Sequence, residues 1–236
     1  MKIWAISDTH GTHRKLLVPP DIDMIIHSGD FTNWRDTVKN SIEAYDFLEW
    51  LMVLNVKYKI LVAGNHDTSL YSGLVKMKNY PEIIYLDHKL VEIEGIKIFG
   101  SPYTPSFGVG WAFNKDRGKI DKYWQQIPEG ADIVVTHGPP QRILDLAVDY
   151  EGVLEYCGCR SLARHIDRVK PKVSIFGHIH NGDGYTNQGV LIRNGVYYMN
   201  ASCVTDNKFD LGPTSNGHVF ELKDGKVIYE ESSNRF

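Results

Sequence analysis

The sequence has few cysteines, and this shortage limits the class of protein. Three cysteines among 236 residues cannot all pair within one chain. Cys157 and Cys159 are spaced too closely for an ordinary disulfide, and no second pair completes a zinc knuckle with them. Disulfides persist mainly in oxidising compartments. We therefore expect free thiols and a cytoplasmic protein.

Long apolar runs and an excess of positive charge are also missing. No run approaches the ~20 apolar residues of a membrane-spanning helix, and the first residues lack the pattern of a secretory signal. A formal net charge of −3 argues against general binding to a nucleic-acid backbone, which requires a basic face. We expect no membrane attachment and a small ligand. The oligomeric state is left open.

Short apolar runs that end on metal-binding residues are the most informative feature present. β-Branched runs next to glycine are typical of buried strands. In open α/β folds, ligands gather beyond the carboxyl ends of such strands. We therefore expect five strand ends to converge on one metal site. The runs are Ile3–Ile6 before Asp8 and His10, Met24–Ile26 before Asp30, Lys59–Ala63 before Asn65, Ile133–Val135 before His137, and Val173–Phe176 before His178 and His180.

The chemistry of these seven candidate ligands favours two metal ions. Mixed carboxylate and imidazole ligands suit manganese, iron or zinc, and we expect Mn²⁺ first. Seven ligands exceed what one tetrahedral ion needs, and Asp30 is the natural bridge between two ions. Two divalent ions, two carboxylates and a bridging hydroxide leave a net charge of about +1, which favours a phosphate. Paired metals clamp the oxygens of an in-line displacement and activate water.

Other residues near these motifs are candidates for catalysis and substrate binding. His66 follows a ligand, and we expect it to steady the phosphoryl oxygen or protonate the leaving group, with Asp67 orienting its ring. Asn33, Phe107 and Asn200 are the candidates for substrate contact, although Asn200 could equally hold the metal-site loops. Of the remaining histidines, we expect His27 to be packed behind the site, and His13, His88, His165 and His218 to be near the surface.

The five strand-end motifs together resemble the signature blocks of the calcineurin-like metallophosphoesterases. The resemblance implies an α/β fold, a four-layer αββα sandwich of two mixed sheets, and we expect one domain over residues 1–236. It further implies that Asp30 serves both ions. One ion would be held by Asp8, His10, Asp30 and His180, and the other by Asp30, Asn65, His137 and His178.

Within that superfamily the chain resembles the small metallophosphoesterase domain-containing branch. This resemblance rests on the N-terminal Ser-Asp-Thr-His, Thr136–Pro140, Phe176–His180 and Asn200–Ser202. Asp30 is not followed by the Asp-Arg-Gly of the phosphoprotein phosphatases, and Asp67 replaces their Glu, which argues against protein dephosphorylation. We expect hydrolysis of small phosphodiesters, with cyclic nucleotides or other nucleotide-derived esters as substrates. The alternatives are a phosphomonoesterase of nucleotides or phosphoproteins, and a binding scaffold without activity.

The remaining pattern predicts the elements around these strands. Spacings of three and four predict a helix over 35–53, with Val38, Ile42, Tyr45, Leu48, Leu51 and Met52 on its buried face. A tight hairpin is expected around Glu94 and Gly95, followed by an ordered loop over 101–110. Further helices are expected over 116–126 and 160–169, and strands over 190–192, 196–199, 218–220 and 227–229.

Overall fold

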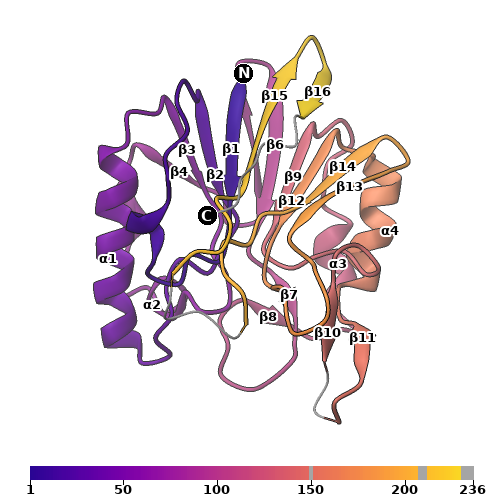
Figure 1. The fold of residues 1–236 in the computed structure, drawn as a ribbon, viewed down its shortest axis with the longest axis horizontal. Helices are drawn as coiled ribbons and strands as arrows, with labels where there is room; N and C mark the ends of the chain where they lie inside the picture. Colours follow the sequence, from indigo (N-terminus) through magenta and orange to yellow (C-terminus); the bar gives the residue numbers. More distant parts are fainter. Residues whose placement is uncertain (149–150, 207–211, 230–236) are drawn as a thin grey trace.

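Two packed sheets with helices outside them form the architecture of the computed structural model, which describes residues 1–148, 151–206 and 212–229 (Figure 1). In spatial order, the first sheet contains β16 (Lys226–Tyr229), β15 (His218–Lys223), β1 (Lys2–Ile6), β2 (Met24–His27), β3 (Tyr58–Leu61) and β4 (Ile83–Tyr85). The second contains β13 (Gly189–Arg193), β14 (Val196–Asn200), β12 (Val173–Phe176), β9 (Ile133–Thr136), β6 (Ile96–Ser101) and β5 (Lys89–Ile93).

Helices and small strands complete the described chain. The helices are α1 (Thr37–Val53), α2 (Thr68–Tyr71), α3 (Asp121–Trp124) and α4 (Arg160–Val169), with 3-10 turns η1 (His13–Lys15) and η2 (Met77–Asn79). Two small pairs join β7 (Thr104–Pro105) to β8 (Asn114–Lys115) and β10 (Leu146–Val148) to β11 (Leu154–Tyr156). Among the helices described, none is long and apolar enough to cross a bilayer.

The alternation of side chains along the central strands creates the four layers. Ile3 and Ala5 of β1 pack between the sheets, whereas Trp4 and Ile6 pack in the cluster that contains the buried face of α1. Successive side chains of a strand point to opposite faces, so one strand supplies two cores. The second sheet packs in the same way against α3 and α4. The predicted αββα sandwich is confirmed.

The parallel centre of each sheet positions the site. Strands β1, β2, β3 and β4 are parallel neighbours, and so are β14, β12, β9 and β6. Their carboxyl ends therefore meet along one edge of the sandwich, where the candidate ligands follow.

The predicted helix over 35–53 forms, and its buried face was predicted correctly at Leu48 and Leu51 but wrongly at Val38, Ile42 and Tyr45. Val38 and Ile42 are 65% and 66% exposed, and the buried apolar residues include Phe47 and Leu48. Asn40 lies on the buried face because its amide donates to the carbonyl oxygens of His66 and Trp34 and to the Thr32 hydroxyl. A polar residue therefore sits on the face where the pattern expected an apolar one.

The other predicted elements agree with the structure except at two places. The hairpin of β5 and β6 turns through Glu94 and Gly95, which both have positive φ, and α4 has the predicted bounds. The helix predicted over 116–126 shrinks to α3, because the Asp116 carboxylate accepts from the Gly118 N–H and makes a turn there. In the predicted loop 101–110, Thr104–Pro105 forms the short strand β7.

Two of the histidines expected near the surface are buried. His13 packs beneath α1, with ring centroids 5.2 Å from Phe47 and 5.1 Å from Trp50. The His218 ring contacts the Asn200 carbonyl oxygen at 2.9 Å. The His218 prediction was wrong because its ring finds a hydrogen-bond partner inside the fold. The His13 prediction was wrong because aromatic side chains of α1 enclose the ring, whose Nε2 atom lies 3.1 Å from the Asp46 carboxylate. His88 and His165 are half-buried.

Candidate metal centre

The strand ends turn into the site through strained backbone. Asp8, His10, Asp30 and His178 have φ values of 51°, 40°, 55° and 70°, a left-handed region that residues other than glycine rarely adopt. Such strain persists where the surrounding structure enforces it, and it clusters at functional sites. Gly177 is required before His178, because a Cβ there would overlap the Asp8 carboxylate.

The first group of donor atoms comes from Asp8, His10 and His180, whose ligand atoms lie within 4.8 Å of one another. The Nε2 atom of His180 is 3.1 Å from Asp8 Oδ1, and its Nδ1 atom is 3.0 Å from Asp206 Oδ1. His10 Nδ1 donates to the Thr32 carbonyl oxygen at 3.1 Å. These outer contacts fix the ring orientations, as the partners of metal-ligating histidines do.

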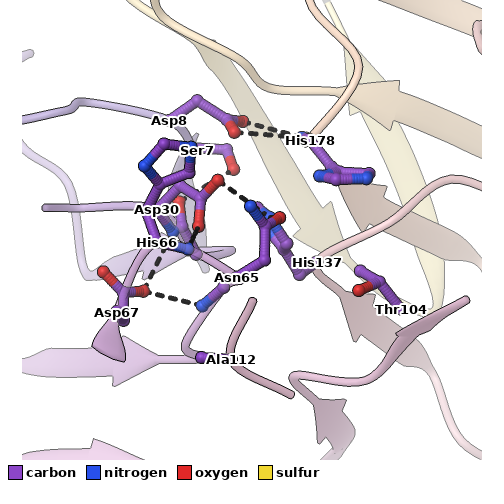
Figure 2. Close-up of polar contacts among 12 residues, drawn as sticks. Ser7, Asp8, Asp30, Asn65, His66, Asp67, Thr104, Ala112, His137 and His178 are labelled. Atoms are coloured by element: carbon purple, nitrogen blue, oxygen red, sulfur yellow. Dashed lines mark hydrogen bonds and ion pairs between the residues drawn. The ribbon is translucent and has the colours of Figure 1, made fainter. Parts of the chain in front are cut away.

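The second group comes from Asp30, His137 and His178, again within 4.8 Å of one another. His137 Nδ1 donates to the Ser28 carbonyl oxygen at 2.9 Å, so Nε2 is left for the site, 3.1 Å from Asp30 Oδ2. The same Nε2 atom lies 2.9 Å from Asn65 Oδ1. Figure 2 shows Asp30, Asn65, His137 and His178 close together. Asn65, predicted as a ligand, therefore adjoins this group.

The protonation of the histidines in the two groups suits metal binding. Burial lowers the pKa of His10 and of His178 to about 3, so both rings are neutral at pH 7 and keep a lone pair. Burial acts in the same direction on His137 and His180, but the carboxylates of Asp30 and Asp8 outweigh it. They raise the pKa of His137 to about 9 and of His180 to about 10.

A divalent ion can take the place of the proton that His137 and His180 carry because of their raised pKa values. Metal binding commonly releases protons from its ligands in this way. Buried carboxylates beside imidazoles, with no thiolate among them, form a donor set that fits manganese, iron or zinc. Two such groups close to each other fit two ions.

Asp67 holds the site together through the backbone. Its buried carboxylate accepts from the N–H groups of Asp30, Thr32 and Gly64 at 3.0, 3.1 and 2.6 Å, and from the Thr32 hydroxyl at 2.8 Å. The His66 ring is oriented instead by the Asn33 carbonyl oxygen, which accepts from Nδ1 at 3.1 Å. The expectation that Asp67 orients that ring is wrong, because the carboxylate is occupied by other donors.

His66 lies between a candidate ligand and an aromatic loop. Its ring centroid is 4.7 Å from that of His10 and 4.6 Å from that of Trp111, and its backbone N–H donates to Asp30 Oδ1 at 2.7 Å. The Arg35 guanidinium lies over the Trp111 ring, 4.3 Å from its centroid. Nothing in the sequence surroundings of Arg35 and Asp206 distinguishes them as members of the site.

A cavity of about 500 Å³ opens beside His178 and His180. Its wall includes the Phe107 ring, 36% exposed and 4.9 Å from the His178 ring, together with apolar side chains such as Val148 and Ile179. Phe107, predicted to contact substrate, is therefore placed to do so. The half-buried Asn33 adjoins His66 through its carbonyl group.

Asn200, the third candidate for substrate contact, is fully buried. Its amide donates to the carbonyl oxygens of Leu144 and Ile179, and its oxygen accepts from the Ser202 N–H. The structure thus gives Asn200 a role in holding the loops beside the ligands rather than a place in the cavity wall. His27 is also fully buried, with Nε2 against the Thr9 hydroxyl at 3.1 Å.

The amino-acid sequence is similar to those of known proteins. The profile of the calcineurin-like phosphoesterase family matches residues 1–182. The human metallophosphoesterase domain-containing protein 1 is 35% identical over 235 residues, which cover 89% of this chain and 68% of that protein. UPF0046 protein K07C11.7 of Caenorhabditis elegans is 33% identical over 230 residues, covering 90% and 73%.

The fold is also similar to that of solved structures. The protein TT1561 of Thermus thermophilus superimposes with a TM-score of 0.63 at 14% identity, over 97% of each chain. At this identity the likeness concerns the fold alone. The family profile and the human relative each span most of the chain. The chain therefore belongs to the calcineurin-like phosphoesterase family, and it is a metal-dependent phosphoesterase.

Proposed function

We propose that this protein hydrolyses small phosphodiesters, with cyclic nucleotides and other nucleotide-derived esters as its substrate class. The observation that carries the proposal is the apolar cavity beside the metal-ligand groups, walled on one side by Phe107. An exposed aromatic ring 4.9 Å from the ring of His178 offers a surface on which a nucleobase can stack. Base stacking on an aromatic side chain contributes ~1–3 kcal/mol.

The ligands in this proposal are the seven residues predicted from the sequence. Asp8, His10 and His180 with Asp30 hold one ion, and Asn65, His137 and His178 with Asp30 hold the other; we expect manganese. When bound, two divalent ions activate water and clamp the oxygens of the phosphate. The chain's own residues then position the ester and move a proton.

His66 supports a role in proton transfer. A carbonyl oxygen can only accept, so the contact with Asn33 places the proton of the His66 ring on Nδ1. In the imidazolium form Nε2 also carries a proton, which it can donate to the leaving oxygen of a bound ester, and the ring then remains neutral with its proton on Nδ1. Trp111 packs against the ring and limits its rotation. Asn33 is retained as a proposed substrate contact.

The scarcity of basic residues in the wall of this cavity supports a diester substrate. Among the described residues that line the cavity, Arg117 is the single lysine or arginine, and Glu155 and Asp206 oppose it. A doubly charged monoester would find little compensation for its charge beyond the ions, whereas a diester carries one charge.

The free state of the three cysteines supports a reducing compartment, and we propose a cytoplasmic location.

A substrate panel tests the proposal directly. The purified protein, loaded with manganese, is assayed against matched cyclic diesters, linear diesters and monoesters of the same nucleoside. Higher kcat/KM on the diesters is the expected result. Preference for monoesters by tenfold or more would instead favour a phosphomonoesterase, and no turnover of any ester with both ions bound would favour a scaffold.

A further inference from the structure

A second cavity, of about 470 Å³, lies beside the first turn of α4. Its walls come from residues 140–143, from α4, and from Arg193 and Tyr198 of the β13–β14 hairpin. Figure 1 shows α4 next to β13 and β14 at the side of the molecule formed by the second sheet. The arginine cavity, as we name it, shares no lining residue with the cavity beside the metal-ligand groups.

Four arginines line this cavity, namely Arg142, Arg160, Arg164 and Arg193. Two carboxylates offset part of their charge, because Asp167 also lines the cavity and Asp121 pairs with Arg164. In the described parts of the chain, no carboxylate lies within ion-pair distance of the other three guanidinium groups. About two positive charges therefore remain uncompensated, although the whole chain carries a formal net charge of −3.

The cavity is also partly preorganised. Arg142 has a φ of 65°, its N–H donates to the Asp145 carboxylate at 2.9 Å, and its guanidinium lies 5.6 Å from the centroid of the Tyr156 ring. The buried Tyr198 and Ile143 give the cavity an apolar floor. Exposed arginine side chains around a concave surface of this volume suit a small polar ligand.

We propose that the arginine cavity binds a small ligand with at least two phosphate charges, at a site separate from the metal centre. Guanidinium groups present planar pairs of donors that match phosphate oxygens, and two negative charges on neighbouring phosphates match the uncompensated charge. A carboxylate-rich peptide spreads single charges along an extended chain, and a concave cavity suits it less well. The loop that leaves β9 separates the two cavities, since Gly138 and Pro139 line one and Pro140 and Gln141 the other.

The test measures binding of pyrophosphate and of ADP to the full-length protein by calorimetry. A chelator removes metal ions first, so that the phosphates cannot bind through them. The test variant combines Arg160→Gln with Arg193→Gln, two exposed positions where a folding defect is not expected. The control is Arg168→Gln, which removes one charge from the same helix at a residue that does not line the cavity.

We expect the test variant to weaken binding of both probes by tenfold or more, and the control to change it by less than twofold. Tighter binding of ADP than of pyrophosphate would show that the apolar floor contacts the organic group of the ligand. Equal binding would show that the cavity recognises the phosphates alone. The proposal is overturned if neither probe binds the wild type, or if the control weakens binding as much as the test variant. It is also overturned if a glutamate-rich peptide binds as tightly as pyrophosphate.

Discussion

The carboxylate of Asp67 accepts a hydrogen bond of 3.0 Å from the backbone N–H of Asp30, the residue expected to bridge two ions. The same carboxylate also accepts from Gly64 and Thr32. Asp67 therefore fixes the turns after two different strands at once. We therefore expect Asp67 to contribute to activity by placing the ligands.

Replacing Asp67 with asparagine tests this positioning role. The NH2 group that replaces one carboxylate oxygen cannot accept a hydrogen bond, so at least one buried backbone N–H loses its partner. We expect the free energy of unfolding to fall by about 1–3 kcal/mol and metal affinity to weaken. Turnover at saturating metal should fall less than tenfold. Denaturant titration and metal titration measure the two effects. A hundredfold loss of turnover with both ions bound and stability unchanged would show that Asp67 acts in the chemistry.

Proton release on metal binding follows from the raised pKa values of His137 and His180. In the metal-free protein the pKa of His137 is about 9 and that of His180 about 10, so both are protonated at pH 7. A metal ion requires the neutral ring, and binding must expel these protons. We expect release of roughly two protons at pH 7, and metal affinity that rises with pH up to about 9–10. Calorimetry in buffers of different ionisation enthalpy gives the number.

Asp206→Asn supplies the matched control for that experiment. It removes the carboxylate that lies 3.0 Å from His180 Nδ1 and helps to raise the pKa of that ring. At pH 9, where a lower pKa of His180 reduces the fraction of protonated rings, fewer protons should be released by this variant than by the wild type. Equal release by both proteins, or none by the wild type, would contradict the assignment.

The strand ends could be predicted from the sequence because they depend on local signals. Apolar runs beside glycine identify buried strands, and Asp30 or His178 shortly after such a run marks the edge where ligands gather. The structure adds the backbone strain, since the positive φ at Asp8 and His10 results from packing between distant segments. No local pattern encodes it.

The sequence-based predictions of burial were wrong where a polar residue has partners that are distant in the sequence. Asn40 occupies the buried face of α1 because it holds the loops of Thr32 and His66. The spacing of apolar residues therefore did not identify the first part of the buried face. His13 is buried because Asp46 and the rings of α1 enclose it. Likewise, Asp206 reaches His180 from a segment 26 residues away. Such contacts depend on tertiary structure, which periodicity does not describe.

His66→Asn tests proton transfer separately from metal binding. The variant should keep both ions and lose turnover by ~10²–10⁴, the usual contribution of a positioned proton donor. The loss should be smaller for nitrophenyl esters, because nitrophenolate leaves without protonation. Metal analysis and kcat across a series of leaving groups provide the measurement. An equal loss for every leaving group would show that His66 positions the phosphate instead.

Phe107→Ala tests how the substrate is recognised. The ring is 36% exposed, lines the cavity beside His178 and contacts Trp111 at 5.6 Å between centroids. Because stacking on an aromatic ring contributes ~1–3 kcal/mol, we expect KM for a cyclic nucleotide to rise by roughly five- to a hundredfold. KM for a small diester without a base should stay within twofold. Val109→Ala is the matched control, since Val109 is in the same loop but 92% exposed. If Phe107→Ala raises KM equally for both diesters, the ring shapes the site without stacking on a base, and the nucleotide assignment loses its main support.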